Sequence, residues 1–185
     1  PYVALIKPSC WEPQEPVEIA YPPREAPART LTLPRYGMPE MKRLDAIHVV
    51  AEFADADTVI VSNIGVPSKE LYASKDRAGN FYMLGSYMQA SAVGLGCAVA
   101  MPKKRVLVID GDGSLLGSAV LPVVAAAYCP NLTIVALDNG TFGSTGNQMS
   151  PAYATADLGF LALGAGIGSV ERACSAEELR AALER

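Results

Sequence analysis

The sequence has few charged residues for its length and no basic stripe. The 185 residues include fifteen lysines and arginines and nineteen aspartates and glutamates, which gives a formal net charge of −4. A nucleic-acid-binding surface needs clustered cations, so we expect no nucleic-acid partner. The longest apolar stretch, residues 88–101, contains Gln89 and two glycines and is shorter than the roughly 20 residues of a membrane span. We therefore expect no membrane-spanning segment.

Closely spaced cysteines and histidines are also lacking. The four cysteines (Cys10, Cys97, Cys129 and Cys174) include no pair at zinc or redox spacing. Cys97 and Cys129 lie in apolar runs, which predicts small core residues. The single histidine, His48, has no acidic partner in view and is interpreted as a surface or packing residue. These features fit a reducing compartment, and we expect a cytoplasmic protein.

Residues 1–40 differ from the rest because they hold most of the prolines. Residues 2–7 (YVALIK) predict one short strand. The recurring prolines that follow exclude a continuous helix or a central strand. We expect residues 1–11 to end a preceding domain, 12–40 to form a linker, and 41–185 to form the main domain. No methionine or signal segment opens the chain, so we expect the tail of a longer polypeptide or, alternatively, a separate subunit.

From Met41 the pattern alternates between helical spacing and short β-branched runs. Leu44, Ile47, Val50 and Ala54 predict the buried face of a first helix. Such alternation predicts an α/β fold, a parallel sheet with helices on both faces. The expected strands are 58–63, 81–85, 105–110 and 131–139, and the expected helices are 41–54, 67–71, 91–101, 114–128, 157–166 and 175–185, the last with a Ser175–Glu178 capping box.

Two strand ends carry polar groups suited to a hard cation and a phosphate. Gly111-Asp112-Gly113-Ser114 follows a buried strand, and Asn139 closes the next strand 27 residues later. One βα unit fits between them, so both side chains should meet at one edge of the sheet. Mg²⁺ prefers carboxylate, amide, carbonyl and phosphate oxygens. The pair predicts a magnesium–phosphate site; the alternative is two ordinary turns.

Longer segments carry a resemblance to a known family. Residues 63–72 (NIGVPSKELY), 80–86 (NFYMLGS), 90–96 (ASAVGLG), 105–116 (RVLVIDGDGSLL) and 137–148 (LDNGTFGSTGNQ) are similar to thiamine-diphosphate-dependent decarboxylases. They most resemble sulfopyruvate decarboxylase β subunits, then phosphonopyruvate decarboxylases. The resemblance implies the diphosphate-binding (PP-type) domain of the thiamine-diphosphate-binding fold. It also implies a pyrimidine-binding domain or α subunit as partner, a homo- or hetero-oligomer and a small 2-oxo acid substrate.

The resemblance further implies cofactor roles for individual residues. Asp112, Asn139 and the Thr141 carbonyl would hold Mg²⁺, and Ser114 would help to bind the diphosphate of thiamine diphosphate. The Gly85 carbonyl would accept the cofactor's 4′-amino hydrogen, and Tyr87 would be the bulky residue beneath the bent cofactor. The implied cofactor-binding set is Gly85, Ser86, Tyr87, Gly111, Asp112, Gly113, Ser114, Asn139, Thr141, Phe142 and Gly143.

Two departures from the family pattern lie beside this site. Tyr87 and Met88 replace a Met-Gly pair, so Met88 would be strained if its backbone needs a positive φ. Pro122 belongs in a first helical turn, so the helix within 114–128 should begin late or bend. A cofactor-binding but catalytically impaired subunit, or a magnesium-dependent phosphate-binding protein unrelated to thiamine, are the alternative functions. Lys69 and Arg77 are the candidate cations for a sulfonate or phosphonate.

Overall fold

The computed structural model describes residues 37–185. Contacts divide the chain into two units, Pro1–Thr30 and Leu31–Arg185. The strand expected at 2–7 and most of the expected linker lie outside the described residues. None of the helices within residues 37–185 is long and apolar enough to cross a membrane.

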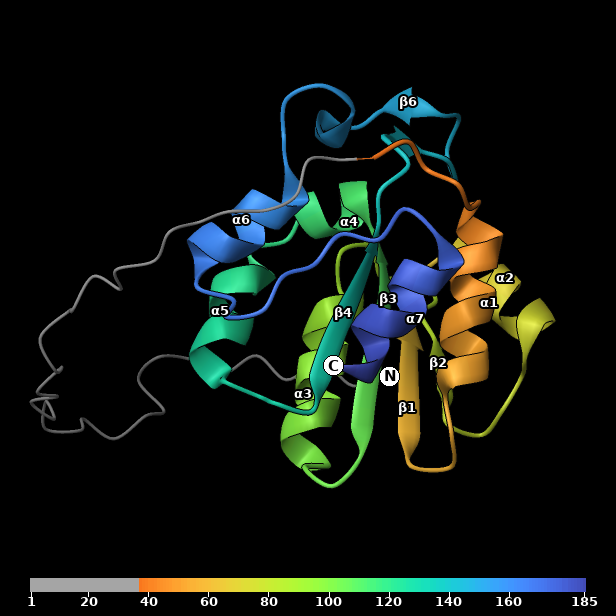
Figure 1. Cartoon of the computed structure of the whole chain (residues 1–185), viewed down its shortest axis with the longest axis vertical. Coiled ribbons are helices and arrows are strands. Elements are labelled where there is room, and N and C mark those ends of the chain that lie inside the picture. The colour runs from red at the N-terminus through yellow and green to blue at the C-terminus, as the bar shows by residue number, and fades with distance from the viewer. Residues whose placement is uncertain (1–36) are drawn as a thin grey trace, which may run out of the picture. The chain divides into compact units, whose positions relative to one another are not determined.

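A four-stranded parallel sheet forms the centre of the described domain (Figure 1). The strand order is β2-β1-β3-β4, and every neighbouring pair is parallel. In register, Thr58 pairs with Arg105, and Gly111 pairs with Leu137. The strands are β1 (Thr58–Ser62), β2 (Asn80–Tyr82), β3 (Arg105–Gly111) and β4 (Leu132–Leu137). The predicted α/β class is confirmed.

Side chains that alternate along the strands fill a core on each face of the sheet. Ile60, Leu107 and Ile109 pack with α1 on one face, and Val61 and Val108 pack with α3 on the other. Figure 1 shows α1 and α7 on one side of the sheet and α3 on the opposite side. The helices are α1 (Arg43–Phe53), α2 (Val66–Ser74), α3 (Ala90–Ala100), α4 (Asp112–Leu116), α5 (Val120–Ala127), α6 (Leu158–Ala165) and α7 (Ala176–Glu184).

Two expectations about packing and one about the end of a strand are wrong in detail. Leu44 is 46 % exposed, because the buried face of α1 is shifted toward Ala46, Val49 and their neighbours. Cys97 and Cys129 are only partly buried rather than core residues. The second strand ends at Tyr82, before the positive-φ turn at Gly85.

The segment after β3 and the loop after β4 differ most from the expected pattern. The helix expected over 114–128 is divided into α4 and α5, and Pro122 lies in the first turn of α5, as its rigid ring predicts. The loop after β4 contains a small antiparallel hairpin, β5 (Thr141–Phe142) and β6 (Gln148–Met149), followed by a 3₁₀ turn, η2 (Pro151–Tyr153). The α7 capping box between Ser175 and Glu178 is confirmed.

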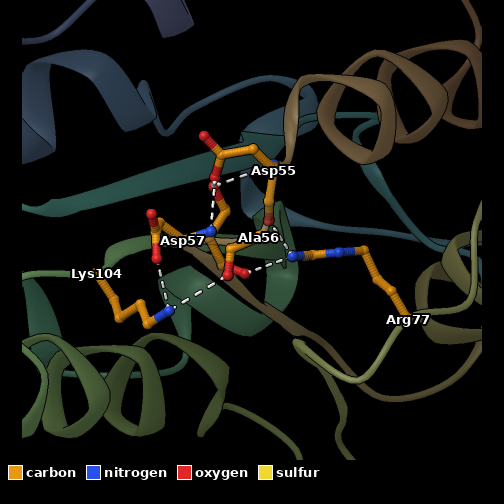
Figure 2. A network of polar contacts seen from close by, with 6 residues as sticks. Asp55, Ala56, Asp57, Arg77 and Lys104 are labelled. Atoms are coloured by element: carbon orange, nitrogen blue, oxygen red, sulfur yellow. Dashed lines mark hydrogen bonds and ion pairs between the residues drawn. The ribbon is translucent and has the colours of Figure 1, made fainter.

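A polar network braces the amino-terminal edge of the sheet (Figure 2). Arg77 Nη2 donates to the Thr58 carbonyl at 2.7 Å and to the Asp55 carbonyl. Lys104 Nζ donates to Asp57 Oδ1 at 2.7 Å. The hydrogen bond from Thr58 Oγ1, followed by that from the Asp57 backbone, lowers the pKa of the Asp55 carboxyl. This network joins the turns that precede β1, β2 and β3.

Candidate functional site

The carboxyl-terminal edge of the sheet contains a topological switch point between β1 and β3. The chain moves from β1 to β2 on one side and returns to β3 on the other. Connections that leave in opposite directions open a crevice, where ligands of α/β sheets bind. Asn63 and Gly111 meet there: the Asn63 backbone N–H donates to the Ile109 carbonyl at 2.8 Å, and a Cβ placed on Gly111 would lie 3.7 Å from Asn63 Nδ2.

The turn at the end of β3 holds two buried polar side chains. Asp112 is 2 % exposed and Ser114 is 3 % exposed. Within residues 37–185 the Ser114 hydroxyl has no hydrogen-bond partner. A buried hydroxyl without a partner costs about 1–3 kcal/mol, so a ligand oxygen at this point would remove that cost. Asp112 Oδ2 accepts a hydrogen bond from Ser150 Oγ.

Asp110, the next-to-last residue of β3, anchors this turn through hydrogen bonds within the protein. Its carboxylate is 1 % exposed and accepts from Ser91 Oγ at 2.6 Å and from the Gly111 backbone N–H at 2.9 Å. Because Ser91 lies in α3, the hydrogen bond joins that helix to the end of β3. The Asp110 carboxylate is therefore satisfied within the protein.

The loop after β4 lies against the same turn. β3 and β4 are neighbours, as the spacing of Asp112 and Asn139 predicts. Asn139 Oδ1 accepts from the Thr141 backbone N–H at 3.1 Å, which folds the loop back on itself. The Phe142 ring covers Gly113 so closely that a Cβ there would lie 2.2 Å from Phe142 Cε1. Only glycine permits this approach, so the two loops depend on each other for their shape.

Negative charge accumulates between these loops. Partial burial, the largest effect, raises the pKa of the Asp138 carboxyl, and the charges of Asp112 and Asp157 raise it further. The hydrogen bond from the Gly140 backbone N–H lowers it, but the net effect is a raised pKa. The residue as a whole lies open to solvent, so its carboxyl is only partly shielded from water. A cation bound beside Asp112 would offset this repulsion.

The segment after β2 reaches toward the same edge. Gly85 has φ 73° and Met88 has φ 67°, so the strain expected for Met88 is present. Tyr87 is 44 % exposed, and partial burial of its hydroxyl, then the charges of Asp112 and Asp110, raises the pKa of that hydroxyl. The Met88 side chain instead covers Gly117, where a Cβ would lie 2.2 Å from Met88 Sδ. Ser86 is partly buried.

An open, mostly apolar pocket of about 380 Å³ adjoins this segment. Met88 and Gln89 line it from the start of α3, and Gly117, Ser118 and Val123 line it from α4 to α5. No charged side chain lines the pocket. It therefore suits an apolar or aromatic group rather than a phosphate.

Sequence reasoning missed three residues at this edge. Asn63 and Ser150 are buried polar residues. In the sequence, Asn63 is marked only by following a strand and Ser150 only by preceding Pro151, and neither feature predicts a place in a site. Arg43 binds Glu70 through Nε and Nη2 at 2.8 and 2.9 Å, while its Nη1 would lie 3.6 Å from a Cβ on Gly143. Arg77, by contrast, donates to the Thr58 carbonyl at the start of β1 (Figure 2). It therefore lies at the amino-terminal edge of the sheet, away from the carboxyl-terminal edge, which does not fit the interpretation of Arg77 as a substrate cation.

A metal site built from several acidic side chains is not present in the described part of the chain. Residues 37–185 contain no group of three or more His, Cys, Asp and Glu side chains that could hold a metal ion. A divalent cation at Asp112 would need amide and carbonyl oxygens and oxygens of a bound phosphate to complete its shell. The donors present therefore fit a metal bound together with a diphosphate, not a metal bound by protein alone.

Comparison with known proteins identifies the family. Residues 69–185 match the family model described as thiamine pyrophosphate enzyme, C-terminal TPP binding domain. The chain belongs to this family. A solved Mycobacterium smegmatis structure, described as a thiamin diphosphate-dependent enzyme, matches with a TM-score of 0.64 at 21 % identity, covering 88 % of this chain and 33 % of that one. At this identity the likeness concerns the fold.

Curated relatives are decarboxylases of related 2-oxo acids. Sulfopyruvate decarboxylase of Methanosarcina acetivorans is 40 % identical over 96 % of this chain and 47 % of its own length. Its counterpart subunit beta in Methanocaldococcus jannaschii is 45 % identical over 70 % of this chain and 69 % of that subunit. Phosphonopyruvate decarboxylase of Streptomyces viridochromogenes is 35 % identical over 87 % of this chain and 41 % of its own length. The chain thus spans about half the length of the first of these relatives.

Proposed function

We propose that this chain is the Mg²⁺- and diphosphate-binding half of a thiamine-diphosphate-dependent decarboxylase that converts sulfopyruvate to sulfoacetaldehyde and CO₂. The observation that carries the proposal is the Asp112–Ser114 turn beside the Asn139 loop, at the carboxyl ends of β3 and β4 in a domain of the thiamine pyrophosphate enzyme family. Phosphonopyruvate is the alternative substrate, supported by the similarity to phosphonopyruvate decarboxylase.

Mg²⁺ and the cofactor diphosphate would share the β3–β4 edge. The Asp112 carboxylate, the Asn139 amide oxygen and the Thr141 carbonyl would bind the ion. The unpartnered Ser114 hydroxyl supports this assignment, because a diphosphate oxygen would satisfy it. Gly111 and Gly113 would let the backbone approach the diphosphate, with Phe142 and Gly143 shaping the facing loop.

The cofactor rings would lie against the turn after β2. Gly85, Ser86 and Tyr87 would contact them, with the Tyr87 ring beneath the bend. Thiamine diphosphate, when bound, supplies the electron sink for loss of CO₂ from a 2-oxo acid, while the protein supplies binding and orientation.

Catalysis would need a second domain. We assign residues 1–11 to the end of a pyrimidine-binding domain, 12–40 to a linker and 41–185 to this domain. A pyrimidine-binding domain or α subunit would complete the site in a homo- or hetero-oligomer, in the cytoplasm. The names of the relatives called subunit beta support such an assembly.

A cofactor-binding subunit with impaired catalysis is the second candidate. The left-handed backbone at Met88 supports it, because a non-glycine residue there costs of order 1–3 kcal/mol. This candidate predicts thiamine diphosphate affinity without turnover in the complete enzyme.

The test uses the complete enzyme assembled with its pyrimidine-binding partner. We expect kcat/KM for sulfopyruvate to exceed that for phosphonopyruvate and pyruvate. Asp112→Ala should abolish Mg²⁺-dependent binding of thiamine diphosphate, which calorimetric titration measures. Asp57→Ala, at the opposite edge of the sheet, should leave that binding unchanged. Unchanged affinity and metal dependence in Asp112→Ala would refute the metal assignment.

A further inference from the structure

Ser150 and Asp112 form a buried contact between residues 38 positions apart. The Ser150 hydroxyl donates to Asp112 Oδ2, and the two residues are 4 % and 2 % exposed. A serine hydroxyl has one proton to donate, and an ionised carboxylate only accepts. The hydroxyl proton is therefore committed to Asp112 Oδ2.

The backbone of Ser150 is tied to the other side of the site. Its N–H donates to the Gly140 carbonyl at 2.8 Å, and the hairpin pairing of Thr141 with Met149 brings the chain back to this point. Ser150 thus connects Asp112, through its side chain, to the loop that carries Asn139 and Thr141, through its backbone. Ser150 therefore helps to hold the two parts of the proposed metal site together, beside the packing of Phe142 on Gly113.

This contact leaves one oxygen of Asp112 for a ligand. Within the described residues Oδ1 accepts no hydrogen bond, whereas Oδ2 is held by Ser150. Mg²⁺ requires near-ideal octahedral geometry, so the direction of the remaining oxygen affects binding. Hydrogen bonds to ligating carboxylates orient them, and loss of such a partner costs 10–100-fold in metal affinity.

We propose that Ser150 is a positioning residue, which turns Asp112 Oδ1 toward a divalent cation and sets the affinity of the site for it. This inference rests on the proposed function, because it takes Asp112 as the metal ligand. A purely structural role, in which Ser150 only closes the hairpin, is the competing explanation. Metal affinity separates the two.

The experiment measures Mn²⁺ binding to the complete enzyme by electron paramagnetic resonance, at a fixed concentration of thiamine diphosphate. We expect Ser150→Ala to raise the Kd for Mn²⁺ by about 10–100-fold and Ser150→Thr, which keeps the donor, to stay within about threefold of the parent. Thr145→Ala is the matched control. It removes the hairpin hydrogen bond to Gln148 Oε1 at 2.9 Å without touching Asp112, so Mn²⁺ affinity should not change.

Equal Kd values for Ser150→Ala and the parent would overturn the inference, and so would an equal loss in Thr145→Ala. Should Ser150→Ala fail to fold, Ser150→Val has the shape of the Ser150→Thr side chain without a donor, and parent-like Mn²⁺ binding by Ser150→Val would count against the inference. Asp112→Ala distinguishes the two levels of failure. If it binds Mn²⁺ like the parent, the proposed metal assignment fails together with Ser150; if only Ser150→Ala is parent-like, Ser150 alone is wrongly assigned.

Discussion

At the scale of single residues, Gly113 has the strictest steric requirement of the site. A Cβ at this position would lie 2.2 Å from Phe142 Cε1 and 2.7 Å from Cδ1, so Gly113→Ala must displace the ring and the loop that carries Asn139. We expect the Kd values for thiamine diphosphate and Mg²⁺ to rise by about tenfold or more, which corresponds to a loss of about 1.4 kcal/mol or more of binding free energy. Calorimetric titration of the assembled enzyme measures it.

Gly96 offers the matched control for this substitution. It lies in α3 with no atom within 4 Å of an added Cβ, so Gly96→Ala should stabilise the helix by roughly 0.5–1 kcal/mol and leave cofactor affinity unchanged. A Gly113→Ala, Phe142→Ala double variant should recover part of the lost affinity, because it restores room. Full cofactor affinity in Gly113→Ala alone would contradict the steric argument.

Tyr87 and Met88 are rival candidates for the bulky residue beneath the cofactor. The Met88 side chain is packed over Gly117, whereas Tyr87 is 44 % exposed, so Tyr87 is the freer of the two to contact a cofactor. Misplacing reacting atoms by about 1 Å can cost 100-fold in rate. We expect Tyr87→Ala to lower kcat by about 10–100-fold and Tyr87→Met, which keeps the bulk, to preserve it. Steady-state decarboxylation by the assembled enzyme decides; a parent-like Tyr87→Ala with an inactive Met88→Ala would assign the role to Met88.

At the scale of elements, the two edges of the sheet have separate tasks. Arg77 joins the turns before β1 and β2 through the Thr58 and Asp55 carbonyls. These turns lie at the amino-terminal ends of the strands, whereas the loops after β3 and β4 lie at the carboxyl-terminal ends. Arg77→Ala should therefore lower the free energy of unfolding by about 1–3 kcal/mol, the cost of losing hydrogen bonds from a charged donor. The KM for substrate and the affinity for cofactor should not change. Thermal melting and steady-state kinetics of the same variant check both statements, and a raised KM with unchanged stability would return Arg77 to the substrate site.

The elements also mark how far sequence reasoning reaches. Long β-branched runs predicted three of the strands to within about two residues, whereas the strand expected at 81–85 ends at Tyr82 and the helix expected over 114–128 is divided into α4 and α5. The order of βα units placed Asp112 and Asn139 after neighbouring strands. The β5–β6 hairpin was missed because strands of two residues carry no periodicity. The Ser150–Asp112 contact was missed because tertiary packing, not local pattern, joins residues 38 positions apart. The shifted face of α1, with Leu44 exposed, reflects packing against α2 and α7 that no single helix specifies.

At the scale of the whole molecule, the described domain begins with a segment that is attached to its opposite end. The Glu40 backbone N–H donates to the Cys174 carbonyl at 2.8 Å, and a Cβ on Gly37 would lie 3.3 Å from Cys174 Sγ. The proline-rich stretch that precedes Gly37 has no apolar periodicity with which to join this core. The boundary of cooperative unfolding should therefore fall just before Gly37.

Two truncations of the chain test this boundary. Deleting residues 1–36 should leave the Tm nearly unchanged, because the core clusters and the Glu40–Cys174 hydrogen bond are retained. Deleting residues 1–40 removes that hydrogen bond and should cost about 0.5–1.5 kcal/mol, a fall in Tm of a few degrees for a domain of this size. Calorimetric melting of both truncations beside the full chain gives the comparison. A fall of several degrees on deleting 1–36 alone would show that this segment belongs to the folding unit and not to a preceding domain, and the assignment of residues 1–11 to a pyrimidine-binding domain would then lose its support.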